Sequence, residues 1–250
     1  MSQVKKALKR KILSNSFLRD LTCLKLDLPH SGPPHNVYSQ YGQEVVIRNL
    51  VKLLPTQSSY LFVDIGAHDG VTFSNSRFLD ETGVWDGILI EPNPEVFNVL
   101  ERNRPGRICI QVAVADNDGD AEFVKNSGYT QMLSGLATSI SLKHMRRIAR
   151  EQKAFAGNTE RIFVRTKKLS SICSERNITR IDLLLIDVEG GEMGVLESLD
   201  FATVEVSIIL VERNQSSKNV WEFLESKGFI RIFQVGADDF YILKGLILSS

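Results

Sequence analysis

The stretch LFVDI at residues 61–65 runs directly into the loop GAHDG at residues 66–70. Its aromatic and branched apolar residues predict a buried strand, and Gly66 and Gly70 would allow a ligand to approach the loop backbone closely. We expect the next residues to open a helix toward the loop. This order is typical of a nucleotide-type cofactor site, and a tight strand-to-helix turn without a ligand is the alternative interpretation.

The carboxylate of Asp64, at the end of the predicted strand, discriminates between cofactors. A dinucleotide would bring a pyrophosphate, which the carboxylate repels, whereas S-adenosylmethionine brings an ammonium and a sulfonium. His68 also stands where the dinucleotide pattern G-x-G-x-x-G has its second glycine. The sequence therefore favours S-adenosylmethionine, and a nucleotide-dependent oxidoreductase that uses NAD is the alternative.

Glu91 ends a second apolar run, GILI at residues 87–90. The two oxygens of its carboxylate could accept hydrogen bonds from both hydroxyls of a ribose. The alternative is that Glu91 favours the start of the helix that we expect after Pro92.

A third run, residues 181–188, leads into the acids Asp187, Glu189 and Glu192. If the strand persists, the i, i+2 spacing of Asp187 and Glu189 projects both carboxylates to one side. We interpret Glu189 as a general base or acceptor-positioning residue, and Asp187 as a neighbour of the sulfonium. A divalent cation held by these acids is an open alternative, although we predict no metal, and so is a purely structural role in which Glu192 favours a helix start. His68 is a second candidate base.

From residue 60 onward, apolar runs alternate with helical patterns, which predicts an α/β fold with a mostly parallel sheet. We expect strands at residues 60–65, 87–91, 107–114, 161–166, 181–188 and 204–211. We expect helices at residues 72–82, 94–103, 169–176 and 218–227. The last two runs, 229–235 and 240–248, predict an antiparallel hairpin because only a short segment separates them.

The chain divides into a basic N-terminal extension, residues 1–37, and one domain, residues 38–250. The alternation stops near residues 126–160, where we expect a lid-like insertion that carries a basic helix. Within the first twenty residues, basic and apolar side chains share a helical pattern. This stretch could contact an anionic membrane surface, or it could be a solvated helix that packs on the domain or on a partner subunit.

Composition narrows the class of partner. The chain has 30 basic and 30 acidic residues, so it lacks the overall positive charge that would favour nucleic acid. Its three cysteines are scattered and lack the C-x-x-C spacing of zinc sites. We therefore expect a cytoplasmic protein whose partner is not a nucleic acid; the small-molecule or glycan acceptor that we expect is implied by the family resemblance described next.

Five motifs occur in an order that resembles the FkbM family of methyltransferases, and the similarity extends over about residues 38–245. They are SQYGQE at 39–44, VDIGAHDG at 63–70, SNS at 74–76, ILIEPNPE at 88–95 and IDVEGGE at 186–192. The resemblance implies a class I (Rossmann-like) fold with a mostly parallel seven-stranded sheet, which uses S-adenosylmethionine. It also implies methylation of a hydroxyl of a sugar, glycan or natural-product-like molecule. A non-catalytic glycan- or partner-binding module on the same fold is a further alternative.

By strand-end position and by this resemblance, we expect two groups of site residues. The expected cofactor contacts are Asp64, Gly66, Ala67, His68, Gly70, Asn75, Glu91, Pro92, Ala113, Val114, Asp116 and Asp187. The expected acceptor contacts are Gln40, Gln43, Glu44, Met132 and Ser134. Two positions depart from the family pattern: Glu44 replaces an aspartate, and Gly191 stands where a larger or polar residue is frequent.

Overall fold

The computed structural model describes residues 37–214 and 217–248. The predicted N-terminal amphipathic stretch lies outside these residues. None of the helices in the described part of the chain is both long enough and apolar enough to cross a lipid bilayer.

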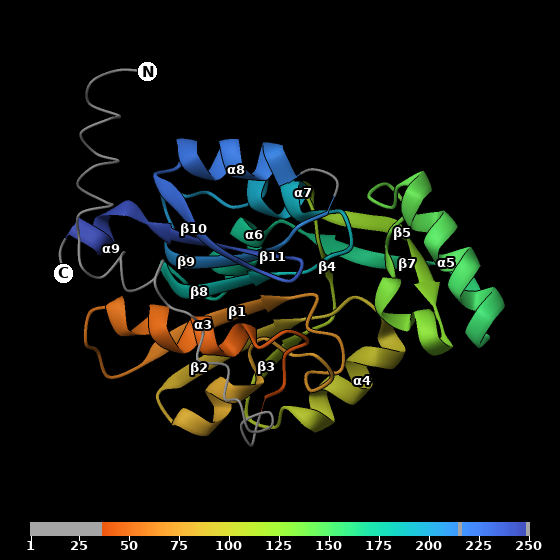
Figure 1. Ribbon diagram of the computed structural model, residues 1–250, viewed down its shortest axis with the longest axis horizontal. Helices are drawn as coiled ribbons and strands as arrows, with labels where there is room; N and C mark the ends of the chain where they lie inside the picture. Colours follow the sequence, from red (N-terminus) through yellow and green to blue (C-terminus); the bar gives the residue numbers. More distant parts are fainter. Residues whose placement is uncertain (1–36, 215–216, 249–250) are drawn as a thin grey trace. The chain divides into compact units, whose positions relative to one another are not determined.

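A seven-stranded sheet forms the centre of residues 38–248, in the order β10-β11-β9-β8-β1-β2-β3 (Figure 1). Its strands are β1 (Tyr60–Ile65), β2 (Trp85–Ile90), β3 (Ile108–Ile110), β8 (Arg180–Ile186), β9 (Glu205–Glu212), β10 (Phe229–Val235) and β11 (Asp238–Leu243). Strands β3, β2, β1, β8 and β9 are parallel to one another, whereas β11 is antiparallel to both β9 and β10. This arrangement confirms the predicted fold class and the C-terminal hairpin.

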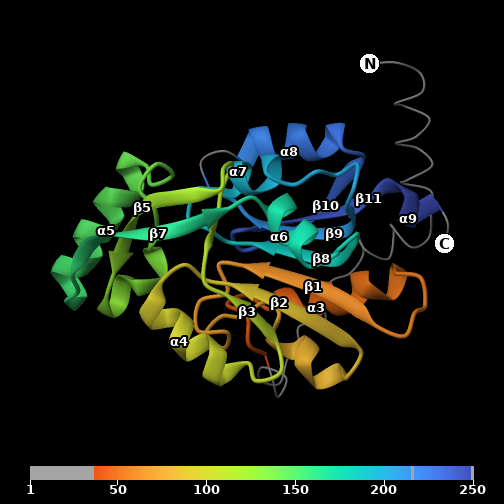
Figure 2. The same cartoon turned by 180° about the vertical axis from the view of Figure 1, so that it is seen from behind.

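Helices cover both faces of this sheet (Figures 1 and 2). One face packs against α6 (Leu169–Glu175), α7 (Glu192–Glu197) and α8 (Ser217–Ser226), and the core there includes Val63 and Ile65 of β1. The opposite side carries α3 (Gln43–Leu50) with the short turn η1 (Val51–Leu53), the 3-10 helix η2 (Arg77–Thr82) and α4 (Pro94–Asn103). The last helix, α9 (Lys244–Leu248), follows β11. Because side chains alternate along a strand, β1 buries apolar side chains on both faces of the sheet. Its carboxyl end lies where the parallel strands of the sheet end.

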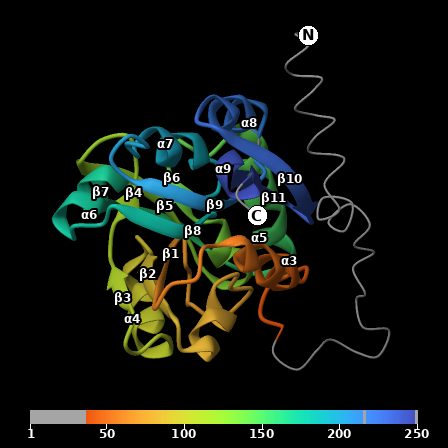
Figure 3. The same ribbon diagram turned by 90° about the vertical axis from the view of Figure 1, so that its left-hand side faces the viewer.

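A second, four-stranded sheet, with the strand order β4-β7-β5-β6, is formed largely by strands on either side of residues 126–160, where the sequence predicts an insertion. It contains β4 (Ala113–Val114), β5 (Gly119–Asn126), β6 (Gly135–Leu136) and β7 (Thr159–Lys167), together with the 3-10 helix η3 (Gly128–Leu133) and helix α5 (Leu142–Phe155). Phe123 and Val164 anchor a small core of its own. The second sheet and α5 lie at one end of the domain (Figures 1 and 2), and Figure 3 views the domain from the opposite end. The segment between β5 and β7 is therefore a folded unit with its own helix.

Four expected elements are wrong in type or extent. The helix expected at residues 72–82 is replaced by a turn and the 3-10 helix Arg77–Thr82, because the Asp69 carboxylate accepts hydrogen bonds from the amides of Val71 and Thr72. The strand expected at 107–114 is divided between β3 and β4, which belong to different sheets. The strand expected at 181–188 stops at Ile186, and the one expected at 240–248 stops at Leu243, where α9 begins.

Candidate active site

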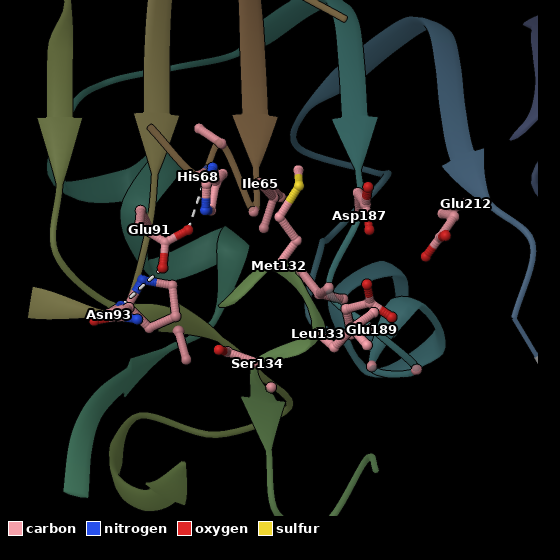
Figure 4. A pocket seen from close by; sticks show the side chains of 18 of the residues that line it. Ile65, His68, Glu91, Asn93, Met132, Leu133, Ser134, Asp187, Glu189 and Glu212 are labelled. Carbon is pink, nitrogen blue, oxygen red and sulfur yellow. Dashed lines mark hydrogen bonds between the residues drawn. The ribbon is translucent and has the colours of Figure 1, made fainter. Parts of the chain in front are cut away.

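A cavity of about 760 Å³ opens at the carboxyl ends of β1, β2 and β8. Figure 4 shows His68, Glu91, Asp187 and Glu212 at the strand ends, with Met132 of the 3-10 helix η3 facing them. The volume lies in the range of small-molecule and cofactor sites, about 300–1,000 Å³. The site is therefore enclosed between the central sheet and the inserted unit.

Gly66 brings the end of β1 against the segment that follows β8. Its φ is +84°, and a Cβ placed on it would lie 1.7 Å from the carbonyl oxygen of Asp187. The amides of Gly66 and Ala67 donate hydrogen bonds to the carbonyl oxygen of Ile90, at 2.9 and 3.1 Å. Glycine is thus required at position 66 both by conformation and by the close approach of another backbone.

Backbone strain concentrates around the cavity. His68, Phe73 and Glu189 line it and have φ values of +50°, +54° and +55°. Such values cost a residue with a Cβ roughly 1–2 kcal/mol, and they gather at functional sites in proteins.

Glu91 is a buried carboxylate held in one orientation. One oxygen accepts a hydrogen bond from the amide of Asn93 at 2.8 Å, and the other accepts one from the amide of His68 at 3.1 Å (Figure 4). Burial raises the pKa of Glu91 to about 7, against the lowering effect of the two amides. The cavity thus contains a preoriented acceptor whose charge changes near neutral pH.

Asp64 is also buried, and its Oδ2 accepts a hydrogen bond from the Ser76 hydroxyl at 2.6 Å. The same hydroxyl accepts one from the guanidinium of Arg104 at 3.1 Å. Burial raises the pKa of Asp64, while Ser76 and Arg104 act in the opposite direction. Asp64 therefore lines the cavity with one oxygen already engaged by the protein.

Three carboxylates gather at the other end of the cavity. Oxygen atoms of Asp187, Glu189 and Glu212 lie within 4.8 Å of one another. Loss of hydration in the concavity and the charge of Glu212 raise the pKa of Asp187, although this side chain faces the open cavity. The same two causes raise the pKa of Glu189. Both Asp187 and Glu189 therefore hold a proton more tightly than an isolated carboxyl group does.

Such an acidic cluster could bind a cation, but each of its three carboxylates already has a protein partner. Glu212 accepts a hydrogen bond from Asn214 at 2.7 Å, and Asp187 shares a hydrogen bond with Glu212. Glu189 Oε2 lies 3.5 Å from Nδ1 of His144. We assign no metal to the cluster.

The comparisons with known proteins agree with this site. A model of the methyltransferase FkbM domain family matches residues 64–231, which include the lining residues at the carboxyl ends of β1, β2 and β8. The chain belongs to the FkbM methyltransferase family. The family and the enzyme class predicted from the motifs, a methyltransferase dependent on S-adenosylmethionine, are therefore confirmed.

Solved structures with some similarity are also methyltransferases. An FkbM methyltransferase from Methylobacillus flagellatus is 12% identical with a TM-score of 0.43, over 76% of this chain and 45% of its own. A TehB-like SAM-dependent methyltransferase from Corynebacterium glutamicum is 10% identical with a TM-score of 0.43, over 92% of this chain and 99% of its own. No curated protein matches the sequence. Family membership rests on the domain match and not on these distant similarities.

Use of S-adenosylmethionine is what membership of the FkbM family implies, and the cavity fits this cofactor. Among the described residues, the side-chain Nδ2 of Asn93 and both ring nitrogens of His68 are buried in this FkbM protein without a hydrogen-bond partner. Asn93 is only 1% exposed and lies beside Glu91 at the cavity wall. A buried polar atom without a hydrogen-bond partner lowers the stability of the fold. These atoms of Asn93 and His68 are therefore suited to bind a polar ligand.

Most of the predicted site residues line the cavity of the FkbM domain. The expected cofactor contacts that do so are Asp64, Gly66, Ala67, His68, Asn75, Glu91, Pro92, Ala113, Val114, Asp116 and Asp187. The expected acceptor contacts Gln40, Gln43, Met132 and Ser134 also line it, as does Glu189. Their individual roles stay predictions.

Two predicted residues do not line the cavity. Gly70 is turned toward α4, where a Cβ would lie 2.6 Å from side-chain atoms of both Leu100 and Arg104. Glu44 is buried, and its carboxylate accepts hydrogen bonds from the amides of Tyr38 and Ser39. Glu44 therefore folds the segment that carries Gln40 and Gln43, and the prediction of direct ligand contact is corrected for both residues.

Several lining residues of this FkbM enzyme escaped prediction. Glu212 ends β9 just as Glu91 follows β2, so the strand-end argument applied to residues 204–211 could have found it. Asp238 begins β11, and because that strand is antiparallel, its start lies at the same edge as the other carboxyl ends. Arg147 and Glu151 come from α5, and nothing in the local sequence indicates where that helix docks.

Proposed function

We propose that this FkbM methyltransferase transfers the methyl group of S-adenosylmethionine to a hydroxyl of a sugar, glycan or natural-product-like small molecule. The observation that carries the proposal is the division of one cavity into two ends. A preoriented buried acceptor, Glu91, lies at one end, and a carboxylate cluster beside Glu189 lies at the other.

The composition of the cavity wall supports a polyhydroxylated acceptor. Carboxylates accept hydrogen bonds from hydroxyl groups, and Asp187, Glu189 and Glu212 bring carboxylate oxygens to within 4.8 Å of one another. Large aromatic side chains also line the cavity while staying open to solvent: Tyr41 is 52% exposed, Phe73 49% and Tyr129 63%. Their ring faces suit the apolar face of a sugar ring, and the carboxylates suit its hydroxyls.

The cofactor supplies an electrophilic methyl group on a sulfonium. Glu91 would accept hydrogen bonds from the ribose hydroxyls, and the buried amide of Asn93 is placed beside it as a further donor. Glu189 would take the proton from the acceptor hydroxyl, and its raised pKa makes its carboxylate a stronger proton acceptor. Holding acceptor and donor in line contributes on the order of 7–11 kcal/mol to such a displacement.

Membership of the FkbM family favours neither of the two alternative functions, a nucleotide-dependent oxidoreductase and a non-catalytic binding module.

We also propose a cytoplasmic location and a small-molecule or glycan partner rather than nucleic acid. The free thiols of Cys109 and Cys173 support a reducing compartment.

The test is incubation of the full chain with radiolabelled S-adenosylmethionine and separate panels of sugars, glycans, glycolipids and polyhydroxylated metabolites. We expect label in an ether-linked methyl group of one panel member, with release of S-adenosylhomocysteine. Label found only on amines, or only on nucleic acid, would contradict the proposed acceptor class.

A further inference from the structure

Helix α5 of the inserted unit places a histidine behind the proposed base. His144 Nδ1 lies 3.5 Å from Oε2 of Glu189, and the two side chains are only 11% and 13% exposed. The two residues are 45 positions apart in the sequence. Glu189 lines the cavity, whereas His144 stands outside its wall. His144 therefore reaches the cavity through two lining residues, the side chain of Glu189 and the backbone of Leu133.

The local fold fixes the orientation of this histidine. Ser141 caps α5 by accepting a hydrogen bond from the His144 amide at 3.1 Å, which places the imidazole in the first turn. The imidazole Nε2 lies 3.1 Å from the carbonyl oxygen of Leu133. The same carbonyl accepts a hydrogen bond at 2.8 Å from the side-chain Nδ2 of Asn126, a fully buried residue. The carbonyl that meets Nε2 is thus itself held in place.

This contact decides which ring nitrogen carries the proton. A carbonyl oxygen can only accept, so Nε2 of His144 must be the donor. In a neutral imidazole the other nitrogen then has a free lone pair, and Nδ1 is the atom that faces Glu189. The arrangement is suited to receive a proton from Glu189 and not to give one to it.

We propose that His144 is a positioning residue that orients Glu189 and takes over the proton that Glu189 receives from the acceptor hydroxyl. This proposal rests on the proposed function. As the acceptor O–H bond breaks and the O–CH₃ bond forms, the S–CH₃ bond breaks and its electron pair stays on sulfur. The hydroxyl proton passes to Glu189 and then to Nδ1 of His144, which leaves an imidazolium beside a regenerated carboxylate.

The surroundings of Glu189 favour this transfer. The charged and titratable groups that act on Glu189 or touch it are His144, Arg147 and Glu151 of α5, Asp187 after β8, Glu192 of α7 and Glu212 of β9. Carboxylates outnumber cations in this set, so the region around Glu189 carries a net negative charge. The positive φ of Glu189 turns its side chain out of the line of β8 and toward the inserted unit.

The first test is independent of turnover. Long-range ¹H–¹⁵N spectra of the ligand-free protein, labelled in histidine, should show His144 as the tautomer protonated at Nε2. His144→Asn assigns its signals. The Glu189→Gln variant should move the Nδ1 resonance and leave that of Nε2 nearly unchanged. Protonation of neutral His144 at Nδ1, or an Nδ1 signal that does not respond to Glu189→Gln, would overturn the proposal even if the enzyme proves to be a methyltransferase.

The second test separates this role from a structural one. In His144→Gln, the glutamine amide can reach the place of Nε2 and keep the bond to Leu133, but nothing replaces Nδ1. We expect kcat to fall about tenfold or more with the cofactor KM unchanged, less than the roughly hundredfold or greater loss for removing the base itself. The matched control is Lys143→Gln, on the exposed side of α5, which should leave kcat unchanged.

A double mutant completes the argument. If His144 acts through Glu189, then His144→Gln combined with Glu189→Gln should be no slower than Glu189→Gln alone. Losses that multiply, or full activity of His144→Gln, would assign His144 a purely structural role. If wild-type protein methylates no acceptor, the proposed function fails separately, and the spectra still decide the contact.

Discussion

The protonation of Glu91 should control how tightly this protein binds S-adenosylmethionine. Its pKa is raised to about 7 by burial, so the unliganded protein is an almost equal mixture of two forms at neutral pH. A ribose hydroxyl donates to the carboxylate, whereas the protonated form has lost its charge and part of its acceptor capacity. The cofactor therefore selects the deprotonated form, and affinity should fall as the pH falls.

The size of the effect follows from the fraction of binding-competent protein. With a pKa of about 7, the deprotonated fraction is roughly 0.9 at pH 8 and roughly 0.1 at pH 6. The apparent association constant should therefore be about tenfold lower at pH 6, which corresponds to about 1.4 kcal/mol. The two backbone amides that hold Glu91 remain in place in both forms, so geometry contributes little to the difference.

Isothermal titration calorimetry at pH 6, 7 and 8, in two buffers of different ionisation enthalpy, measures both affinity and proton release. About half a proton should be released on binding at pH 7. Glu91→Gln is the control, since it keeps the size of the side chain and cannot ionise. Ionisations of the cofactor itself are common to both proteins. A wild-type affinity that is constant from pH 6 to 8, or an equal pH dependence in Glu91→Gln, would refute the reasoning.

Four further predictions concern single residues. Glu189→Gln should lower kcat about 10²- to 10⁴-fold and leave the calorimetric affinity for the cofactor unchanged. Gly66→Ala should cost well over 2 kcal/mol in urea unfolding because of a backbone clash, whereas Gly83→Ala, at a φ of +70° with open space around it, should cost only about 1 kcal/mol. Arg104→Met should cost about 3 kcal/mol, since the fully buried guanidinium pairs with Asp80 at 2.7 Å, and an unchanged denaturation midpoint would contradict this. Folding raises the pKa of Glu91 from 4.5 to about 7, so its contribution to stability is complete below pH 4.5 and is lost as the pH rises through 7. The unfolding free energy of Glu91→Gln, measured relative to wild type, should therefore increase by up to about 3 kcal/mol between pH 5 and pH 8.

The sequence predicted well the central sheet and the position of Asp64 and Glu91 at strand ends, because both depend on short-range pattern. Strand periodicity placed Asp64 and Glu91 at strand ends, and the carboxyl ends of parallel strands meet at one edge. The errors arose where a local hydrogen bond or a distant contact competed with the pattern. The Asp69 turn prevented the helix expected at residues 72–82, and Glu44 was engaged by its own neighbours instead of a ligand.

By itself, then, the sequence determined the class of the fold, the family, and that Asp64, Glu91 and Asp187 lie at the ends of strands. These depend on residue type and on the order and spacing of residues along the chain. Only the tertiary structure decided which side chains from the inserted unit and the antiparallel hairpin meet those acids, as His144 meets Glu189 and Asp238 joins the cavity wall. The physical reason is that the docking of one element on another depends on the packing of whole surfaces, which no local periodicity encodes.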